Sequence, residues 1–188
     1  MKKINSININ SREYWDEHIA KPTFGLREKK YLELAGNGEK IVDLGCGLSP
    51  FADKAREQFE KTYGMDFSAE TLKEAKKAHP KVNYSIGSVL ATPYADKQFD
   101  VCVAGEVIEH IVHYEYMLEE MARITKRRMI LSTARMEYND PEHLWEFNKK
   151  DLAEMGSKYG KTQVEEIKSD WFPGRSYLFL TIDLNGTI

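Results

Sequence analysis

The chain has 188 residues, of which 41% are hydrophobic and 30% charged, and its net charge is −3. This balance is typical of globular proteins, and the length suits a single domain over residues 1–188. The acidic excess argues against a general nucleic-acid-binding protein, which normally carries more basic than acidic residues.

The remaining composition predicts a cytoplasmic protein that makes no membrane contact. Two cysteines, Cys46 and Cys102, are too few for a disulfide framework. No apolar run approaches the roughly 18 residues that a membrane span needs. The first residues are polar rather than the apolar core of a signal peptide. Nothing in the sequence indicates the oligomeric state.

Helices and strands are predicted to alternate along the chain. Short apolar runs bounded by turn residues indicate strands, and amphipathic stretches indicate helices. Ser68, with Thr71 three residues further on, is a typical N-cap. Helices are expected over residues 11–18, 27–34, 50–60, 69–78, 116–125 and 149–158. Strands are expected over residues 40–44, 61–66, 82–86, 99–104, 128–132, 163–168 and 177–184.

This alternation predicts an α/β fold with a mostly parallel sheet covered by helices on both faces. Only the short turn 172–175 separates the last two strands. A parallel crossover needs a longer connection, so these strands should form an antiparallel C-terminal hairpin.

The strongest local signal is the segment 42–47 (VDLGCG), which joins the first strand to the next helix. Gly45 and Gly47 allow a tight turn and close approach of a ligand. Dinucleotide-binding loops hold a pyrophosphate, yet here Asp43 precedes the glycines and no basic residue follows before Lys54. A ligand carrying an ammonium and a sulfonium suits these charges better than an anion does.

A second acidic position follows the next strand, about twenty residues after the glycine-rich turn. Asp66 there can accept hydrogen bonds from both ribose hydroxyls of an adenosine. Ser88 and Val89 follow the third strand, where the edge of an adenine is expected. Each residue alone is more often a turn or cap, but the ordered set points to a nucleoside ligand.

These residues, together with segments 99–104 (FDVCVA) and 106–110 (EVIEH), resemble the class I S-adenosylmethionine-dependent methyltransferases. The resemblance covers residues 40–133 and implies a Rossmann-like, seven-stranded sheet whose last strand is antiparallel. It implies a methionine end lined by the glycine-rich turn and a sulfonium beside Glu106. The cofactor-binding residues that it implies are Asp43, Gly45, Cys46, Gly47, Asp66, Phe67, Ser88, Val89 and Glu106.

The sequence departs from the family pattern at two places. Leu48 and Ser49 replace the small, often glycine-containing continuation of the loop. Ser88 stands where many members have Asp, so the adenine contact would depend on a hydroxyl or the backbone. Residues 1–36 are expected to form a helical lid segment, with Tyr14, Trp15, Phe24 and Arg27 over the cofactor or simply packed on the domain.

The segment 106–110 can also carry chemistry. On a helix, Glu106, Glu109 and His110 would share one face. With His143 from a later loop, they are candidate ligands for a divalent metal such as Mn²⁺, Fe²⁺, Co²⁺ or Mg²⁺. His110 and His143 are also the candidate general bases.

Two acceptor classes follow from the resemblance. Ubiquinone-biosynthesis-type methyltransferases carry a similar Glu-x-x-Glu-His segment without a catalytic metal and act on small molecules. Metal-dependent methyltransferases of the 3′-terminal ribose of small RNAs carry it with a second histidine downstream, similar to His143 here. The acidic pI of about 6.0 favours a small-molecule acceptor, methylated at oxygen or nitrogen.

Two rival functions belong to other classes. A nicotinamide-dependent dehydrogenase would need an anion-binding loop, which Asp43 and the missing third glycine disfavour. A regulatory module that binds the cofactor without chemistry would show tight binding and no turnover.

Overall fold

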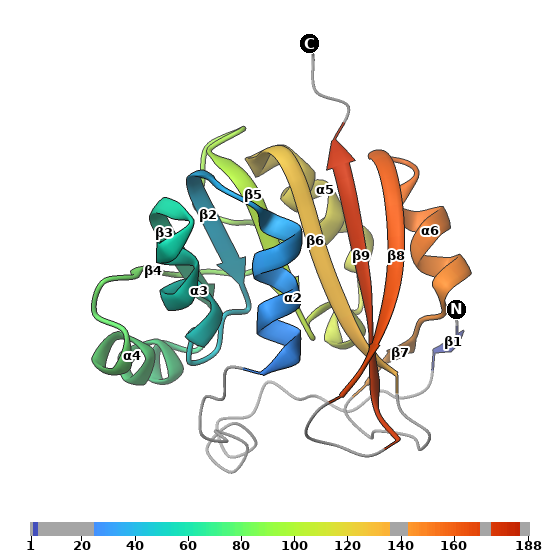
Figure 1. The fold of residues 1–188 in the computed structure, drawn as a ribbon, viewed down its shortest axis with the longest axis horizontal. Coiled ribbons are helices and arrows are strands. Elements are labelled where there is room, and N and C mark those ends of the chain that lie inside the picture. The colour runs from blue at the N-terminus through green and yellow to red at the C-terminus, as the bar shows by residue number, and fades with distance from the viewer. Residues whose placement is uncertain (1, 4–24, 136–142, 170–173, 185–188) are drawn as a thin grey trace.

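In the computed structural model, residues 2–3, 25–135, 143–169 and 174–184 are described. They contain a seven-stranded sheet in the order β4-β3-β2-β5-β6-β9-β8 (Figure 1). The central pairs are parallel, whereas β9 is antiparallel to both β6 and β8. The predicted α/β sheet with a C-terminal antiparallel hairpin is therefore confirmed. The strands are β2 (Gly38–Leu44), β3 (Phe59–Asp66), β4 (Asn83–Ile86), β5 (Phe99–Gly105), β6 (Thr125–Arg135), β8 (Gly160–Lys168) and β9 (Ser176–Leu184).

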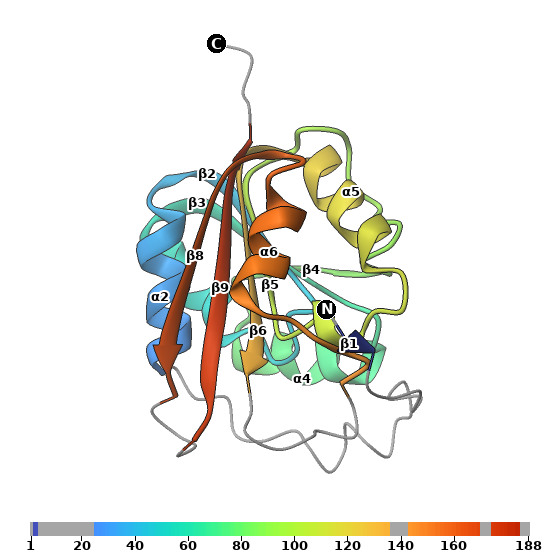
Figure 2. The same cartoon turned by 90° about the vertical axis from the view of Figure 1, so that its right-hand side faces the viewer.

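Helices cover both faces of this sheet (Figure 2). The helices α2 and α3 pack on one face, and α5 and α6 on the other. Two short 3-10 helices, η1 and η2, follow α3 and β5. The bounds are α2 (Leu26–Ala35), α3 (Pro50–Lys54), η1 (Ala55–Glu57), α4 (Ala69–Ala78), η2 (Ile108–His110), α5 (Tyr114–Ile124) and α6 (Lys149–Gly156).

Apolar residues at alternate strand positions divide the core between the two faces. On the α2 and α3 face, the Tyr31 ring lies 5.3 Å from Phe51 and 5.1 Å from Phe179. On the α5 and α6 face, the Phe99 ring lies 5.1 Å from Tyr63. Strands buried on both faces explain the near-continuous apolar runs in the sequence.

The helix predicted over residues 50–60 was wrong in its second half. The α-helix ends at Lys54, a single 3-10 turn follows, and β3 begins at Phe59. Phe59 is 4% exposed and pairs with Gly38 in the parallel register of β2 and β3. Burial of this ring and strand pairing outweigh the local helical pattern. The N-cap prediction is confirmed, because Ser68 Oγ accepts a hydrogen bond from the Thr71 amide at 3.2 Å.

A small antiparallel pair lies outside the main sheet and was missed. The strand β1 (Lys2–Lys3) pairs with β7 (Trp145–Glu146). Two-residue strands give no periodic pattern, so the sequence carries no signal for them. The helix expected over residues 11–18 and the lid residues Tyr14, Trp15 and Phe24 lie outside the described residues. Within the described part, no helix combines the length and apolar character that crossing a membrane requires.

The strand order creates a crevice at the carboxyl end of the sheet. From β2 the chain continues outward to β3 and β4, and it then returns to the opposite side of β2 as β5. Ligands of open α/β sheets bind at such a reversal of strand order. The residues that follow β2, β3, β4 and β5 therefore meet at one place.

Phe99 supplies a test of the core on the α5 and α6 face. It is 0% exposed, and its ring lies 4.8 Å from Tyr94 as well as 5.1 Å from Tyr63. We expect Phe99→Ala to lower the free energy of unfolding by about 3–5 kcal/mol, because it leaves a cavity among these rings.

The matched control is Tyr116→Ala on α5, whose side chain is 58% exposed. Its effect should stay within about 0.5 kcal/mol. Urea unfolding followed by circular dichroism measures both. Equal losses for the two variants would contradict this assignment of the core.

Candidate functional site

The glycine-rich turn after β2 is anchored to the neighbouring strand. The amides of Gly45 and Cys46 both donate to the carbonyl oxygen of Met65, at 2.8 and 3.0 Å. Gly45 has φ 69°, and a Cβ there would lie 2.5 Å from a methyl group of Val107. Gly47 has φ 51°. Both glycines therefore occupy backbone conformations that other residues rarely adopt.

The carboxylate of Asp66 connects this turn to the loop after β3. Its Oδ2 accepts from the Gly47 amide at 3.0 Å, and its Oδ1 accepts from the Ser68 amide at 2.9 Å. Burial raises the pKa of Asp66, while the backbone amides of Ser68 and Gly47 oppose that shift. Asp66 also lines the pocket at the carboxyl ends of the strands. Its contact with a ribose stays a prediction.

Asp43 lies deeper, one residue before the end of β2. Its side chain is buried, and burial raises its pKa to about 8. The guanidinium of Arg27 on α2 opposes this shift, and the carboxylates of Asp66 and Glu28 add to it. Glu28 in turn holds Arg27, accepting from its Nε at 2.9 Å and its Nη2 at 2.7 Å.

A pocket of about 520 Å³ opens at the carboxyl ends of β2 to β5. Small-molecule sites commonly have volumes of roughly 300–1,000 Å³. Two carboxylates line it, and no lysine or arginine of the described chain does. The lining residues are Gly45, Asp66, Phe67, Gly87, Ser88, Val89, Leu90, Glu106, Val107, His110, Ile111, Val112 and His113.

The pocket brings together seven of the predicted site residues from four separate loops. These seven are Gly45, Asp66, Phe67, Ser88, Val89, Glu106 and His110. The other five predicted site residues are not in its lining; they are Asp43, Cys46, Gly47, Glu109 and His143. Sequence reasoning missed the apolar part of the lining, which includes Leu90, Val107, Ile111 and Val112. Loop residues follow no helical or strand period, so no pattern could select them.

The segment after β5 differs from the helix that was considered for it. Only Ile108–His110 forms a helix, and it is a single 3-10 turn. Glu106 precedes that turn with φ 58°, and its carboxylate accepts from Ser132 Oγ and from Arg175 Nη2, each at 2.8 Å. The prediction that Glu106 shares one face with Glu109 and His110 was therefore wrong. Glu106 lies before the 3-10 turn in a left-handed conformation, so these three residues do not belong to one α-helix.

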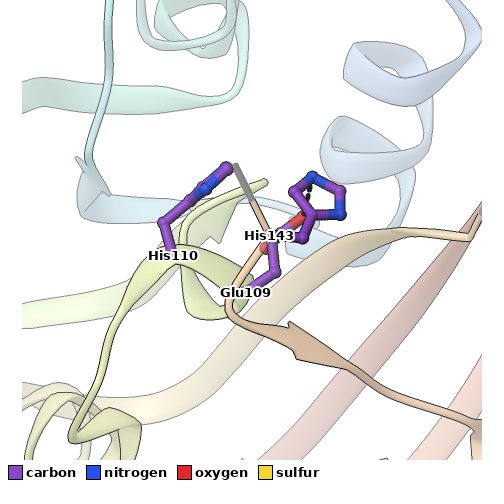
Figure 3. A group of neighbouring side chains, drawn as sticks. All are labelled: Glu109, His110 and His143. Carbon is purple, nitrogen blue, oxygen red and sulfur yellow. Dashed lines mark ion pairs between the residues drawn. The ribbon is translucent and has the colours of Figure 1, made fainter. Parts of the chain in front are cut away.

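The other three candidate ligands do come together (Figure 3). One ligand atom from each of Glu109, His110 and His143 lies within 4.8 Å of the others. The Glu109 Oε1 to His143 Nε2 distance is 4.0 Å, and the two imidazole centroids are 5.0 Å apart. The Leu144 amide donates to the Glu109 carbonyl at 2.8 Å, which holds the His143 segment against η2.

Glu109 is the buried member of this cluster. Its side chain is fully buried, and among the described residues its Oε2 has no hydrogen-bond partner. Its Oε1 accepts from the Ala134 amide at 3.2 Å. Burial, reinforced by the charge of Glu106, raises the pKa of Glu109. A buried carboxylate oxygen without a donor is a place where a proton or a cation is stabilised.

Comparison with known proteins agrees with this site. Residues 42–133 match the family model described as a methyltransferase domain. A malonyl-[acyl-carrier protein] O-methyltransferase of Erwinia billingiae is 31% identical over 88 residues, which cover 47% of this chain and 35% of that protein. A demethylmenaquinone methyltransferase of Paenarthrobacter aurescens is 29% identical over 89 residues, which again cover 47% and 35%. The chain thus spans about a third of the length of these relatives.

The fold is shared more widely than the sequence. Phosphoethanolamine N-methyltransferase 2 of Haemonchus contortus, solved in complex with S-adenosyl-L-methionine, superposes with a TM-score of 0.74 at 12% identity. The match covers 95% of this chain and 59% of that one. The chain therefore shares the fold of a protein solved with S-adenosyl-L-methionine, and its segment 42–133 resembles methyltransferase domains in sequence.

The raised pKa of Asp43 predicts how stability depends on pH. Its pKa is about 8 in the folded chain and near the ordinary 3.8 when unfolded. The folded state therefore keeps a proton that the unfolded state loses, and stability falls as pH rises from about 4 to 8. Within that window, Asp43 lowers the free energy of unfolding by up to about 1.4 kcal/mol for each pH unit.

Asp43→Asn removes this titration. Urea unfolding of the cofactor-free protein at pH 5 and pH 8 should show a smaller loss for the variant than for the wild type. Parallel pH profiles for the two proteins would show that Asp43 does not keep its proton in the folded state.

Proposed function

We propose that the chain transfers a methyl group from S-adenosylmethionine to an oxygen or nitrogen of a small molecule. The observation that carries the proposal is the pocket at the reversal of strand order, with Asp66 and Glu106 in its lining and no lysine or arginine among the described lining residues. Such a pocket attracts a cationic ligand and repels a pyrophosphate. The match of residues 42–133 to the methyltransferase family supports the same cofactor.

Each lining element then has a distinct role. Asp66 would accept hydrogen bonds from the ribose hydroxyls, with Phe67 beside it. Ser88 and Val89, after β4, would face the adenine. Glu106, after β5, would lie near the sulfonium. The glycine-rich turn, with Cys46 and Gly47, and the buried Asp43 would shape the methionine end.

The chemical step needs a positioned nucleophile and a proton acceptor. A lone pair of the acceptor attacks the methyl carbon, the carbon–sulfur bond breaks, and its electron pair stays on sulfur. Positioning of the two reactants supplies much of the rate enhancement. His110, which lines the pocket, or His143 beside it would take the proton that the nucleophile loses.

A small-molecule acceptor is favoured over RNA. The relatives from Erwinia billingiae and Paenarthrobacter aurescens are named for malonyl-[acyl-carrier protein] and demethylmenaquinone. The described pocket lining lacks the lysine and arginine that bind a phosphate backbone. Turnover of an acceptor also separates an enzyme from a module that only binds the cofactor.

Asp66→Ala tests the cofactor assignment. S-adenosylmethionine should raise the melting temperature of the wild-type chain, and NAD should not. The variant should bind S-adenosylmethionine more weakly by about 1.5–3 kcal/mol, the usual value of hydrogen bonds to a charged group. Isothermal titration calorimetry measures both affinities.

Asp100→Ala is the matched control. Its carboxylate also accepts from two backbone amides, of Glu39 and Lys40 at 2.6 and 2.9 Å, but at the amino end of the sheet. The affinity of the Asp100→Ala variant for the cofactor should equal that of the wild type. Stabilisation of the wild-type chain by NAD alone would overturn the proposed function.

The second candidate function is metal-assisted methyl transfer. The cluster of Glu109, His110 and His143, with the unpartnered Glu109 Oε2, carries it. Two imidazoles and one carboxylate suit Mn²⁺, Fe²⁺ or Co²⁺ better than Mg²⁺, which prefers oxygen ligands alone. A bound metal would supply a Lewis acid that lowers the pKa of an acceptor hydroxyl. Glu106 is not part of this ligand set, because Ser132 and Arg175 engage its carboxylate.

Titration with Co²⁺, followed by visible absorption, tests the cluster directly. His110→Ala and His143→Ala should each abolish the cobalt bands while leaving cofactor binding measurable. His79→Ala is the control, because His79 pairs with Asp53 away from the pocket. Methyl transfer that persists after exhaustive chelation would leave the metal-free reaction as the function.

A further inference from the structure

Glu106 receives its second contact from the far end of the chain. Arg175, which immediately precedes β9, donates from Nη2 to Glu106 Oε2 at 2.8 Å. The side chains are 21% and 13% exposed, so water screens this ion pair less than a surface pair. The hairpin of β8 and β9 thereby reaches the carboxylate that lines the pocket.

The strand β9 fixes the position of this guanidinium. Arg175 Cζ lies 5.2 Å from the centre of the Tyr177 ring, a cation–π distance. Tyr177 is 5% exposed and pairs with Ala134 of β6. The positive charge therefore stays beside the pocket because a buried ring in the sheet supports it.

The Glu106 carboxylate is equally constrained. Its Oε1 accepts from Ser132 Oγ at 2.8 Å, and that hydroxyl shares a 2.5 Å hydrogen bond with Tyr31. The Glu106 amide donates to the Ser132 carbonyl at 3.1 Å. These contacts hold a non-glycine residue at φ 58°, a conformation that costs free energy and persists only where its surroundings enforce it. The carboxylate thus faces the pocket at a fixed position with a cation already paired to it.

We infer that Arg175 determines how strongly the pocket prefers S-adenosylmethionine over S-adenosylhomocysteine. This inference rests on the proposed function. The cofactor carries a net positive charge through its sulfonium, whereas the product has a neutral thioether. An unpaired Glu106 would attract the sulfonium strongly, and a guanidinium at 2.8 Å offsets part of that attraction.

The offset has a consequence for the reaction. Positive charge leaves the sulfur as the methyl group moves to the nucleophile. A carboxylate that bound the sulfonium tightly would stabilise the ground state more than the transition state, and it would slow the step. Arg175 limits this penalty while Glu106 keeps its place in the pocket lining.

Arg175→Met removes the charge and keeps a long side chain. Calorimetry on the full chain gives the dissociation constants of S-adenosylmethionine and S-adenosylhomocysteine. We expect the preference for the charged cofactor to rise at least about fivefold, which is the effect of one unit charge at about 4 Å in bulk water and therefore a minimum for this partly buried pair. The ratio of the two constants cancels any loss of folded protein common to both titrations.

Arg128→Met is the matched control. Arg128 pairs with Asp183 at the opposite end of β9, with 27% of its side chain exposed, and does not line the pocket. The ratio of the two dissociation constants for Arg128→Met should match that of the wild type. Arg175→Lys, which keeps the charge, should also stay near the wild-type ratio.

The outcomes separate this inference from the proposed function. A wild-type chain that binds neither compound would overturn the proposed function itself. If the wild type binds both but Arg175→Met leaves the ratio unchanged or lowers it, Arg175 does not tune the preference. If Arg175→Lys shifts the ratio as far as Arg175→Met, the guanidinium geometry rather than its charge would be responsible, and the inference would fail.

Discussion

The crevice of this protein depends on one carboxylate that holds two loops together. Asp66 accepts from the amides of Gly47 and Ser68, and the amides at the start of the glycine-rich turn bind the Met65 carbonyl. These contacts satisfy backbone donors that would otherwise be buried without partners at the ends of two parallel strands. They fix the spacing of the loops after β2 and β3, which both contribute residues to the pocket lining.

This arrangement buries several carboxyl groups in and around the site. Burial raises the pKa values of Asp43, Asp66 and Glu109, because it disfavours their charged forms. Arg27 on α2 opposes the shift at Asp43, and Arg175 at the start of β9 pairs with the neighbouring carboxylate of Glu106. A cationic ligand would compensate part of the negative charge of these carboxylates. Its binding would therefore stabilise the folded state.

The pocket lining and the charged groups beside it come from different parts of the chain. The segment 42–133, which matches the methyltransferase family, contains every described residue that lines the pocket. His143 and Arg175 lie after this segment and approach from the loop beyond β6 and from the C-terminal hairpin. Relatives that share only the matched segment therefore need not share these groups. In our proposals, the family segment binds the cofactor, and the later segments influence the acceptor proton and the charge of the site.

The sequence by itself determined the fold class, the glycine-rich turn and the acidic positions at the strand ends. Apolar runs and turn residues report burial and backbone conformation locally, and parallel strands bring their carboxyl ends to one edge. Only the tertiary structure decided that Phe59 belongs to a strand and that Arg175 pairs with Glu106. It also decided that Glu106 lies outside the cluster of Glu109, His110 and His143. Each of these outcomes depends on partners distant in sequence: Gly38 on the neighbouring strand, Ser132 on β6, and Tyr177 on β9. Local periodicity carries no information about contacts made across the sheet, so side-chain charge and helical spacing alone could not assign them.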